Sequence, residues 1–142
     1  MPDTADYQPW HRYKDAITAS ARLSLADGEK ALRLVDDAIA LAISEHENRW
    51  VVALNHHAAI IANFLGKAEL VKHYYQKSLD FSPENFRALY GLAKVAKNQG
   101  DLGLVREYAA RCHKALTEGD HFLRDSWLET LETLLKDWPP LD

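Results

Sequence analysis

The chain has 142 residues, a length typical of one compact domain. Hydrophobic residues make up 47% of it and charged residues 27%, which excludes a disordered or fibrous protein. Its net charge of −4 argues against broad nucleic-acid binding. The sequence lacks a membrane-spanning run and the basic, apolar start of a cleaved signal, and its one cysteine, Cys112, suits a reducing compartment. We therefore expect a soluble, cytoplasmic protein without a nucleic-acid or membrane partner.

Pro83 is the only proline between Pro9 and Pro139, so proline interrupts almost none of the chain. Alternating runs of β-branched residues, which would indicate strands, are missing. Apolar residues instead recur every three or four positions, as on one face of a helix. This spacing predicts seven helices, over 7–26, 29–43, 48–64, 67–81, 84–98, 101–116 and 120–137. The predicted fold is all-α, in one domain of residues 1–142, with short connections that make consecutive helices antiparallel.

The fifth predicted helix shows how its ends are read from the sequence. Ser82 is a candidate N-cap, Pro83 is tolerated in the first turn, and Glu84 lies near the positive end of the helix. Gly100 closes the segment and begins the turn to the next helix.

Gly66 and Gly100 define a candidate repeat period, because a shift of 34 superimposes the two glycines and similar residues on either side of them. The aligned pairs are Ala58 with Leu92, Ala59 with Ala93, Ala62 with Ala96, Val71 with Val105, and Tyr74 with Tyr108. Earlier in the chain two shifts compete. Placing Gly28 on Gly66 requires a shift of 38, whereas the apolar face from Val35 fits the later helix best at a shift of 36. We prefer the shift of 36, because burial of an apolar face outweighs one loop glycine.

The segment 71–85 resembles the second helix and closing turn of a tetratricopeptide repeat (TPR). The resemblance gives two TPR-like units, 49–83 and 84–117, after a degenerate first helix pair at about 7–46. The amphipathic helix 120–137, with Phe122, Trp127 and Leu131, is similar to the capping helix that closes such a stack. In this family small residues let paired helices approach, and Tyr75 is expected to fill the gap between neighbouring units.

The resemblance implies a right-handed α-solenoid whose first helices line a concave surface. Proteins of this family bind a peptide or a helix of another protein there, and they are not enzymes. The helical face that would line the surface is a polar stripe distinct from the apolar face. The predicted partner-binding residues are His56, Asn63, Arg87, Tyr90, Lys94 and Lys97, with Ala53, Ile60 and Phe64 beside them. The basic members favour an acidic peptide.

Sequence signatures of catalysis are missing, including those of phosphate loops, zinc proteases, zinc ribbons and serine hydrolases. No two histidines are four residues apart on a predicted helix, the spacing of a helical metal clamp. Cys112 falls on a packing position and is expected to be buried and inert. We therefore expect no enzyme, no catalytic residue, no metal and no cofactor.

Three alternatives remain open. The polar stripe could be a solvated face without a ligand. The chain could be a self-associating scaffold whose homodimer patch includes Phe122 and Trp127, or Trp10 and Tyr13. It could also be an enzyme or a metal- or haem-binding helical protein of another type. A TPR adaptor that grips a chaperone C-terminus is disfavoured, because His57 and Gly91 replace the usual asparagine and basic residue.

Overall fold

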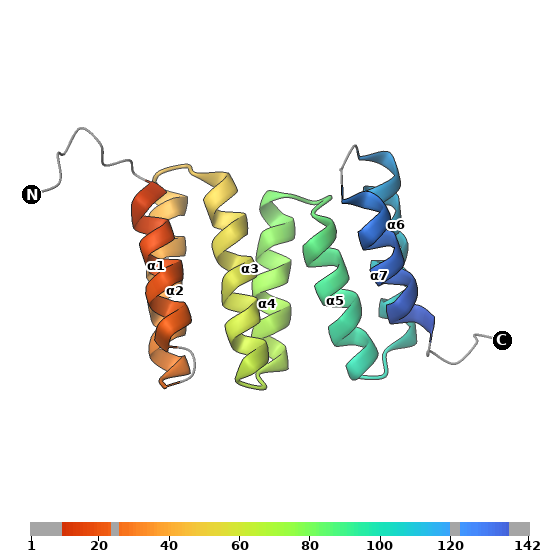
Figure 1. The fold of residues 1–142 in the computed structure, drawn as a ribbon, viewed down its shortest axis with the longest axis horizontal. Coiled ribbons are helices and arrows are strands. Elements are labelled where there is room, and N and C mark those ends of the chain that lie inside the picture. Colours follow the sequence, from red (N-terminus) through yellow and green to blue (C-terminus); the bar gives the residue numbers. More distant parts are fainter. Residues whose placement is uncertain (1–9, 24–25, 120–122, 137–142) are drawn as a thin grey trace, which may run out of the picture. The chain divides into compact units, whose positions relative to one another are not determined.

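The computed structural model describes residues 10–23, 26–119 and 123–136. Seven α-helices and no strand occur in this part of the chain, which confirms the all-α fold class (Figure 1). The helices are α1 (Trp10–Leu23), α2 (Gly28–Ser44), α3 (Asn48–Phe64), α4 (Ala68–Phe81), α5 (Phe86–Asn98), α6 (Leu102–Glu118) and α7 (Arg124–Lys136). None of the predicted helices is missing, and most observed ends fall within two residues of the predicted ones.

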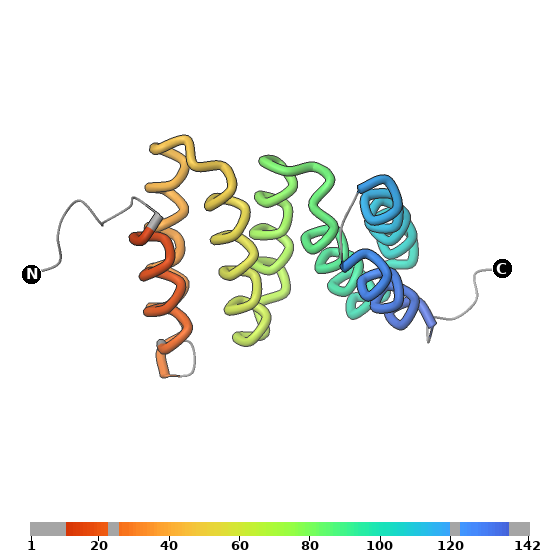
Figure 2. The backbone as a smooth tube through the Cα atoms, turned by 45° about the horizontal axis from the view of Figure 1, so that its top comes forward, coloured from red at the N-terminus to blue at the C-terminus, as the bar shows by residue number. Residues whose placement is uncertain are grey.

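The helices belong to two compact units, residues 1–81 and residues 82–142. Unit 1 contains α1 to α4, and unit 2 contains α5 to α7 (Figure 2). The division follows Phe81 and precedes Pro83, where the sequence predicts the end of one repeat.

Unit 1 is held together by small and medium apolar side chains. In α3, Ala58, Ala59 and Ala62 are fully buried, and short side chains let the adjacent α4 approach closely. The other buried apolar residues of α2 to α4 are Ala31, Leu32, Val35, Ala38, Ala42, Val51, Leu54, Ile61, Val71, Tyr74 and Leu79. Asn55 is also buried, and its Nδ2 donates to the carbonyl of Val51 at 2.8 Å. This bond offsets the cost of burying the amide.

Unit 2 has a core of the same kind between α5 and α6. The buried apolar residues of these helices are Ala88, Leu89, Leu92, Ala93, Val95, Ala96, Val105, Ala109, Cys112 and Leu116. In α7, Leu131 and Leu134 are buried, and this helix packs against α6.

The start of α5 differs from the prediction. Asn85, not Ser82, is the N-cap, and its Oδ1 accepts from the backbone N–H of Ala88 at 3.1 Å. Pro83 and Glu84 lie in a turn before the helix, closed by a bond from the Asn85 N–H to the Ser82 carbonyl at 3.0 Å. Asparagine is among the best N-cap residues, and here the cap at Asn85 displaces the one predicted at Ser82.

Three helix ends share one turn geometry, in which a residue with positive φ ends the helix. These residues are Gly66 (φ 72°), Gly100 (φ 75°) and His46 (φ 58°). In each turn the next residue donates its N–H to a carbonyl five positions back, as in a Schellman motif. The pairs are Glu47 with Ala42, Lys67 with Ala62, and Asp101 with Ala96, at 2.9–3.0 Å. The shift of 34 between the two glycines therefore corresponds to a repeated backbone conformation.

Gly28 does not belong to this set, which removes the reason for the shift of 38. It is the first residue of α2, after the N-cap Asp27, and its φ is not positive. A Cβ at Gly28 would lie 2.4 Å from Leu65 Cδ2, so the glycine provides space. The shift of 36 instead superimposes buried residues: Val35 on Val71, Ala38 on Tyr74, and Ala42 on Ser78.

One further prediction needs correction. The first helix does not reach residue 26, because Ala26 lies in the turn before the Asp27 cap. Tyr75 is partly buried, and the expectation that it fills the gap between neighbouring units stays a prediction. Its neighbour Tyr74 is 4% exposed and donates a hydrogen bond from its hydroxyl to Asp36 at 2.8 Å. Burial and the Asp36 carboxylate raise the pKa of Tyr74 above its ordinary value. Phe122 of the predicted last helix lies outside the described residues.

We predict that Gly66→Ala and Gly100→Ala each lower the free energy of unfolding by about 1 kcal/mol, because a Cβ is strained at positive φ. The matched control is Gly103→Ala, in the first turn of α6, where a Cβ meets nothing closer than 3.7 Å. This control should leave stability unchanged or raise it by about 0.5 kcal/mol. Denaturant unfolding measures all three, and equal effects at positions 66 and 103 would contradict the turn geometry.

Candidate functional site

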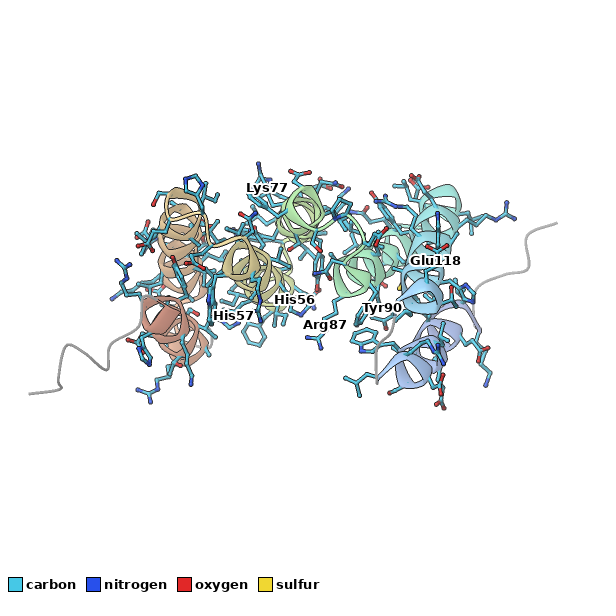
Figure 3. All side chains as sticks on the ribbon, turned by 90° about the horizontal axis from the view of Figure 1, so that it is seen from above. His56, His57, Lys77, Arg87, Tyr90 and Glu118 are labelled. Carbon is cyan, nitrogen blue, oxygen red and sulfur yellow. The ribbon has the colours of Figure 1, made fainter. Side chains whose placement is uncertain are left out.

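In unit 1, one face of α3 is open to solvent along its length. Ile60 is 51% exposed and Phe64 is 60% exposed, one helical turn apart. Ala53 and Asn63 are exposed on the same face, and His56 is partly buried, with its ring 5.7 Å from that of Tyr75. His56 and His57 lie on the side of unit 1 opposite Lys77 (Figure 3). The structure thus brings the predicted α3 residues together on one surface that carries two large exposed apolar side chains.

In unit 2, the predicted residues of α5 divide into two groups. Arg87 and Lys94 are exposed, seven positions apart and therefore on one side of the helix. Tyr90 and Lys97 are partly buried.

Tyr90 and Lys97 both contact α7. The Trp127 ring is 5.0 Å from the Phe86 ring and 5.6 Å from the Tyr90 ring, both in edge-on geometry. The Arg87 guanidinium is 5.8 Å from the Trp127 ring, within reach of a cation–π contact. At the other end of the helix, the Lys97 ammonium donates to the backbone carbonyl of Leu134. Three of the four α5 residues predicted to bind a partner therefore contact α7.

The sequence predicted a capping helix over 120–137 but did not predict which residues α7 contacts. The signal was present in the spacing of Trp127, Leu131 and Leu134, which lie at i, i+4 and i+7 on one face. Which helix that face packs against depends on tertiary contacts that spacing alone does not specify.

A buried polar contact joins α1 to α3 in unit 1. Ser20 is fully buried, and its Oγ lies 2.7 Å from His57 Nε2 and donates to the Ile17 carbonyl at 2.9 Å. With the hydroxyl proton directed at Ile17, the Ser20 oxygen accepts from the His57 ring. Burial disfavours the imidazolium and lowers the pKa of His57 below its ordinary value, against a smaller opposing effect of the Ile17 backbone.

A second polar cluster joins α1 to the end of α2. The Tyr13 hydroxyl and the Arg12 guanidinium both donate to the Glu45 carboxylate, and the Tyr13 ring lies 5.4 Å from that of Trp50. Burial, followed by the Glu45 bond, raises the pKa of Tyr13 to about 12. The hydrogen bond from Tyr13 lowers the pKa of Glu45. Tyr13 is 0% exposed, so it is not available for the predicted homodimer patch. The side chain of Trp10 and residue Phe122 lie outside what the structure describes.

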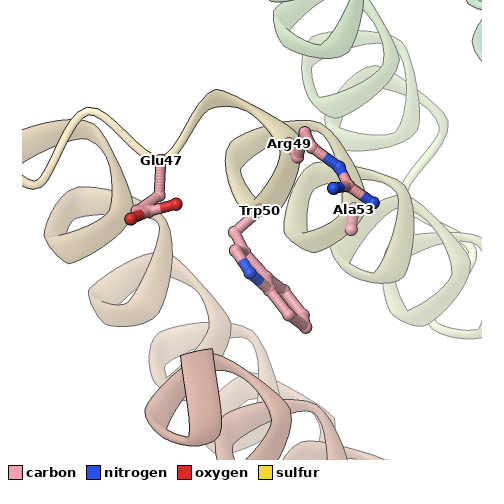
Figure 4. Close-up of a pocket in the computed structure, with 4 residues that line it drawn as sticks. All are labelled: Glu47, Arg49, Trp50 and Ala53. Carbon is pink, nitrogen blue, oxygen red and sulfur yellow. The ribbon is translucent and has the colours of Figure 1, made fainter. Parts of the chain in front are cut away.

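A shallow pocket of about 490 Å³ lies at the start of α3 (Figure 4). Glu47, Arg49, Trp50 and Ala53 line it. The carboxylate and guanidinium are exposed and solvated, so they lack the desolvation that general acid–base catalysis needs. A smaller pocket of about 150 Å³ lies in unit 2, lined by Pro83, Glu84, Leu89, Arg111, Lys114, Ala115 and Glu118.

Within the described ranges, no group of three or more His, Cys, Asp or Glu side chains is placed to hold a metal ion. The same part of the chain has no helix with the length and apolar character to cross a bilayer. Cys112 is buried as expected; its thiol lies 3.4 Å from the Phe86 carbonyl, and burial raises its pKa to about 11.

Comparison with known proteins finds no family model that matches the chain and no match among curated proteins.

We predict that His57 makes the stability of the protein pH-dependent. Its pKa is lowered in the folded state, so the unfolded chain binds more protons as the pH falls through about 6.5. The free energy of unfolding should therefore decrease below that pH, and His57→Gln should flatten the decrease. Urea unfolding between pH 5 and pH 8 measures the effect.

The matched control is His113→Gln, on the exposed face of α6. It should reproduce the wild-type pH dependence. If the two variants give the same profile, the Ser20–His57 contact does not couple to stability.

We predict that Cys112 is protected in the folded protein, because its thiolate is disfavoured by burial. A thiol reagent at pH 8 should modify the native protein at least a hundredfold more slowly than the urea-unfolded protein, as a raised thiol pKa implies. Equal rates would place the thiol at the surface.

Proposed function

We propose that the chain is a non-catalytic protein-interaction module, a short TPR-like α-solenoid that binds an acidic peptide or helix. The exposed faces of α3 and α5 are the proposed binding surfaces. In this proposal α3–α4 and α5–α6 are two repeats, and α7 is a cap.

The recurrence of local structure at the shift of 34 supports the repeat assignment. Ser78 Oγ donates to the Val52 carbonyl at 3.3 Å, and Cys112 Sγ lies 3.4 Å from the Phe86 carbonyl. The shift that carries Gly66 to Gly100 also carries both members of the first pair to those of the second. Each contact joins the second half of one helix to the start of the helix before it. This is the arrangement expected of antiparallel helix pairs.

The observation that carries the binding proposal is the exposure of Ile60 and Phe64 on α3. Large apolar side chains that are half or more exposed one turn apart are typical of a surface that a partner covers. In α5, Arg87, Lys94 and Lys97 occur without any acidic residue on the helix, although the whole chain has a net charge of −4. This local positive charge favours an acidic partner and speeds its association.

Peptide selection on the immobilised full chain tests the proposal. We expect short peptides rich in Asp and Glu, with apolar anchors, to be enriched from a random displayed library. The affinity of the synthesised peptides should fall as the salt concentration rises. In Arg87→Glu/Lys94→Glu the affinity should fall about tenfold or more, because two attractive charges become repulsive.

The matched control is Arg106→Glu/Lys114→Glu, which reverses one arginine and one lysine on exposed positions of α6. Its net charge equals that of the first double variant, and its peptide affinity should stay within about twofold of wild type if the binding is local to α5. A third variant, Ile60→Ser/Phe64→Ser, reports on the α3 face. An absence of enriched peptides, or equal losses in the two charge-reversed variants, would contradict the proposal.

A further inference from the structure

The apolar face by which α7 packs on α5 and α6 has the anchor spacing of a helix bound in a groove. Trp127 of α7 packs on Phe86 and Tyr90, and one and two turns later Leu131 and Leu134 are buried. Anchors at i, i+4 and i+7 are the pattern by which amphipathic helices bind hydrophobic surfaces of other proteins. Within unit 2, α7 therefore lies on α5 and α6 as a ligand helix would.

The polar end of the contact also fits a helix ligand. The last carbonyl groups of a helix have no hydrogen-bond partner within the helix. The Lys97 ammonium of α5 donates to one of them, the Leu134 carbonyl in the final turn of α7. Because Trp127 lies by the start of α5 and Leu134 by its end, the two helices run in the same direction.

α7 buries far fewer of its residues than α5 does. Both helices have 13 residues, but α5 has seven buried residues and α7 has two. Leu135 of α7 remains 38% exposed. A helix that buries so little opens at a lower free-energy cost than the core helices do.

We propose that the α5 face formed by Phe86, Tyr90 and Lys97 is a helix-binding surface, and that α7 is its resident, displaceable occupant. The external partner is an amphipathic helix with an aromatic residue followed by leucines four and seven positions later. This inference rests on the proposed function and names its partner class and its regulation. In the free protein α7 covers the face, and a partner helix must compete with it.

A labelled peptide with the sequence of residues 124–136 tests the inference on the full chain. Trp127→Ala weakens the docking of the resident helix and leaves the α5 face intact. Fluorescence anisotropy should give at least tenfold tighter peptide binding to this variant than to wild type. A smaller gain is expected for Leu134→Ala, and none for Leu135→Ala, which alters the exposed side of α7. A peptide in which the tryptophan is replaced by alanine should bind none of them detectably.

Circular dichroism checks that each variant is folded, and hydrogen exchange of the wild type supplies a readout that needs no variant. Amides of α7 should exchange at least tenfold faster than those of α5. The inference is overturned if folded Trp127→Ala binds the peptide no better than wild type, or if α7 and α5 are equally protected. If the α7 peptide experiment fails but the selected acidic peptides still bind through Arg87 and Lys94, the proposed function stands and only this inference is rejected. If no acidic peptide binds but the α7 peptide does, the preference for acidic peptides is rejected and the helix-binding surface on α5 stands.

Discussion

Close approach of helix backbones across alanine-rich faces is the constraint on which the rest of the structure depends. Ala58, Ala59 and Ala62 of α3 are fully buried, and Ala93 and Ala96 of α5 are buried at corresponding positions. Side chains this short leave room for a neighbouring helix at short range, and the larger buried residues fill the space around them. Consecutive helices can pack through these faces because the chain reverses direction in short turns. Gly66 and Gly100 make these turns possible by adopting positive φ at the helix ends.

Because one face of each helix packs in the core, the opposite face is left for solvent or for contact with another helix. In α3 the opposite face carries Ile60 and Phe64, which the fold of unit 1 leaves exposed. The corresponding face of α5 is not fully open to solvent, because Trp127 packs on Phe86 and Tyr90 there. Lys94 on this helix stays exposed. The same helical periodicity thus produces an apolar open surface in one unit and a partly occupied, basic surface in the other.

Polar groups inside the units join helices that apolar contacts alone would hold less specifically. Ser20 with His57 and Tyr13 with Glu45 attach α1 to α3 and to the end of α2. Each of these contacts buries polar atoms that must stay paired, so their geometry restricts how α1 can lie on unit 1. The polar contact between α7 and α5 is the bond from Lys97 to the Leu134 backbone. This difference is consistent with α1 as a fixed element and α7 as an exchangeable one.

The sequence by itself determined the all-α class, the seven helices and the recurrence at a shift of 34, because helical periodicity and turn glycines are local properties. It also placed Cys112 and the alanine faces correctly in the core. Only the tertiary structure decided that Tyr74 is buried and Tyr75 partly buried, that Gly28 makes room for Leu65, and that α7 contacts Tyr90 and Lys97. These outcomes depend on which helix lies opposite a given face. That is settled by shape and contact between segments distant in the chain, and no single segment encodes it.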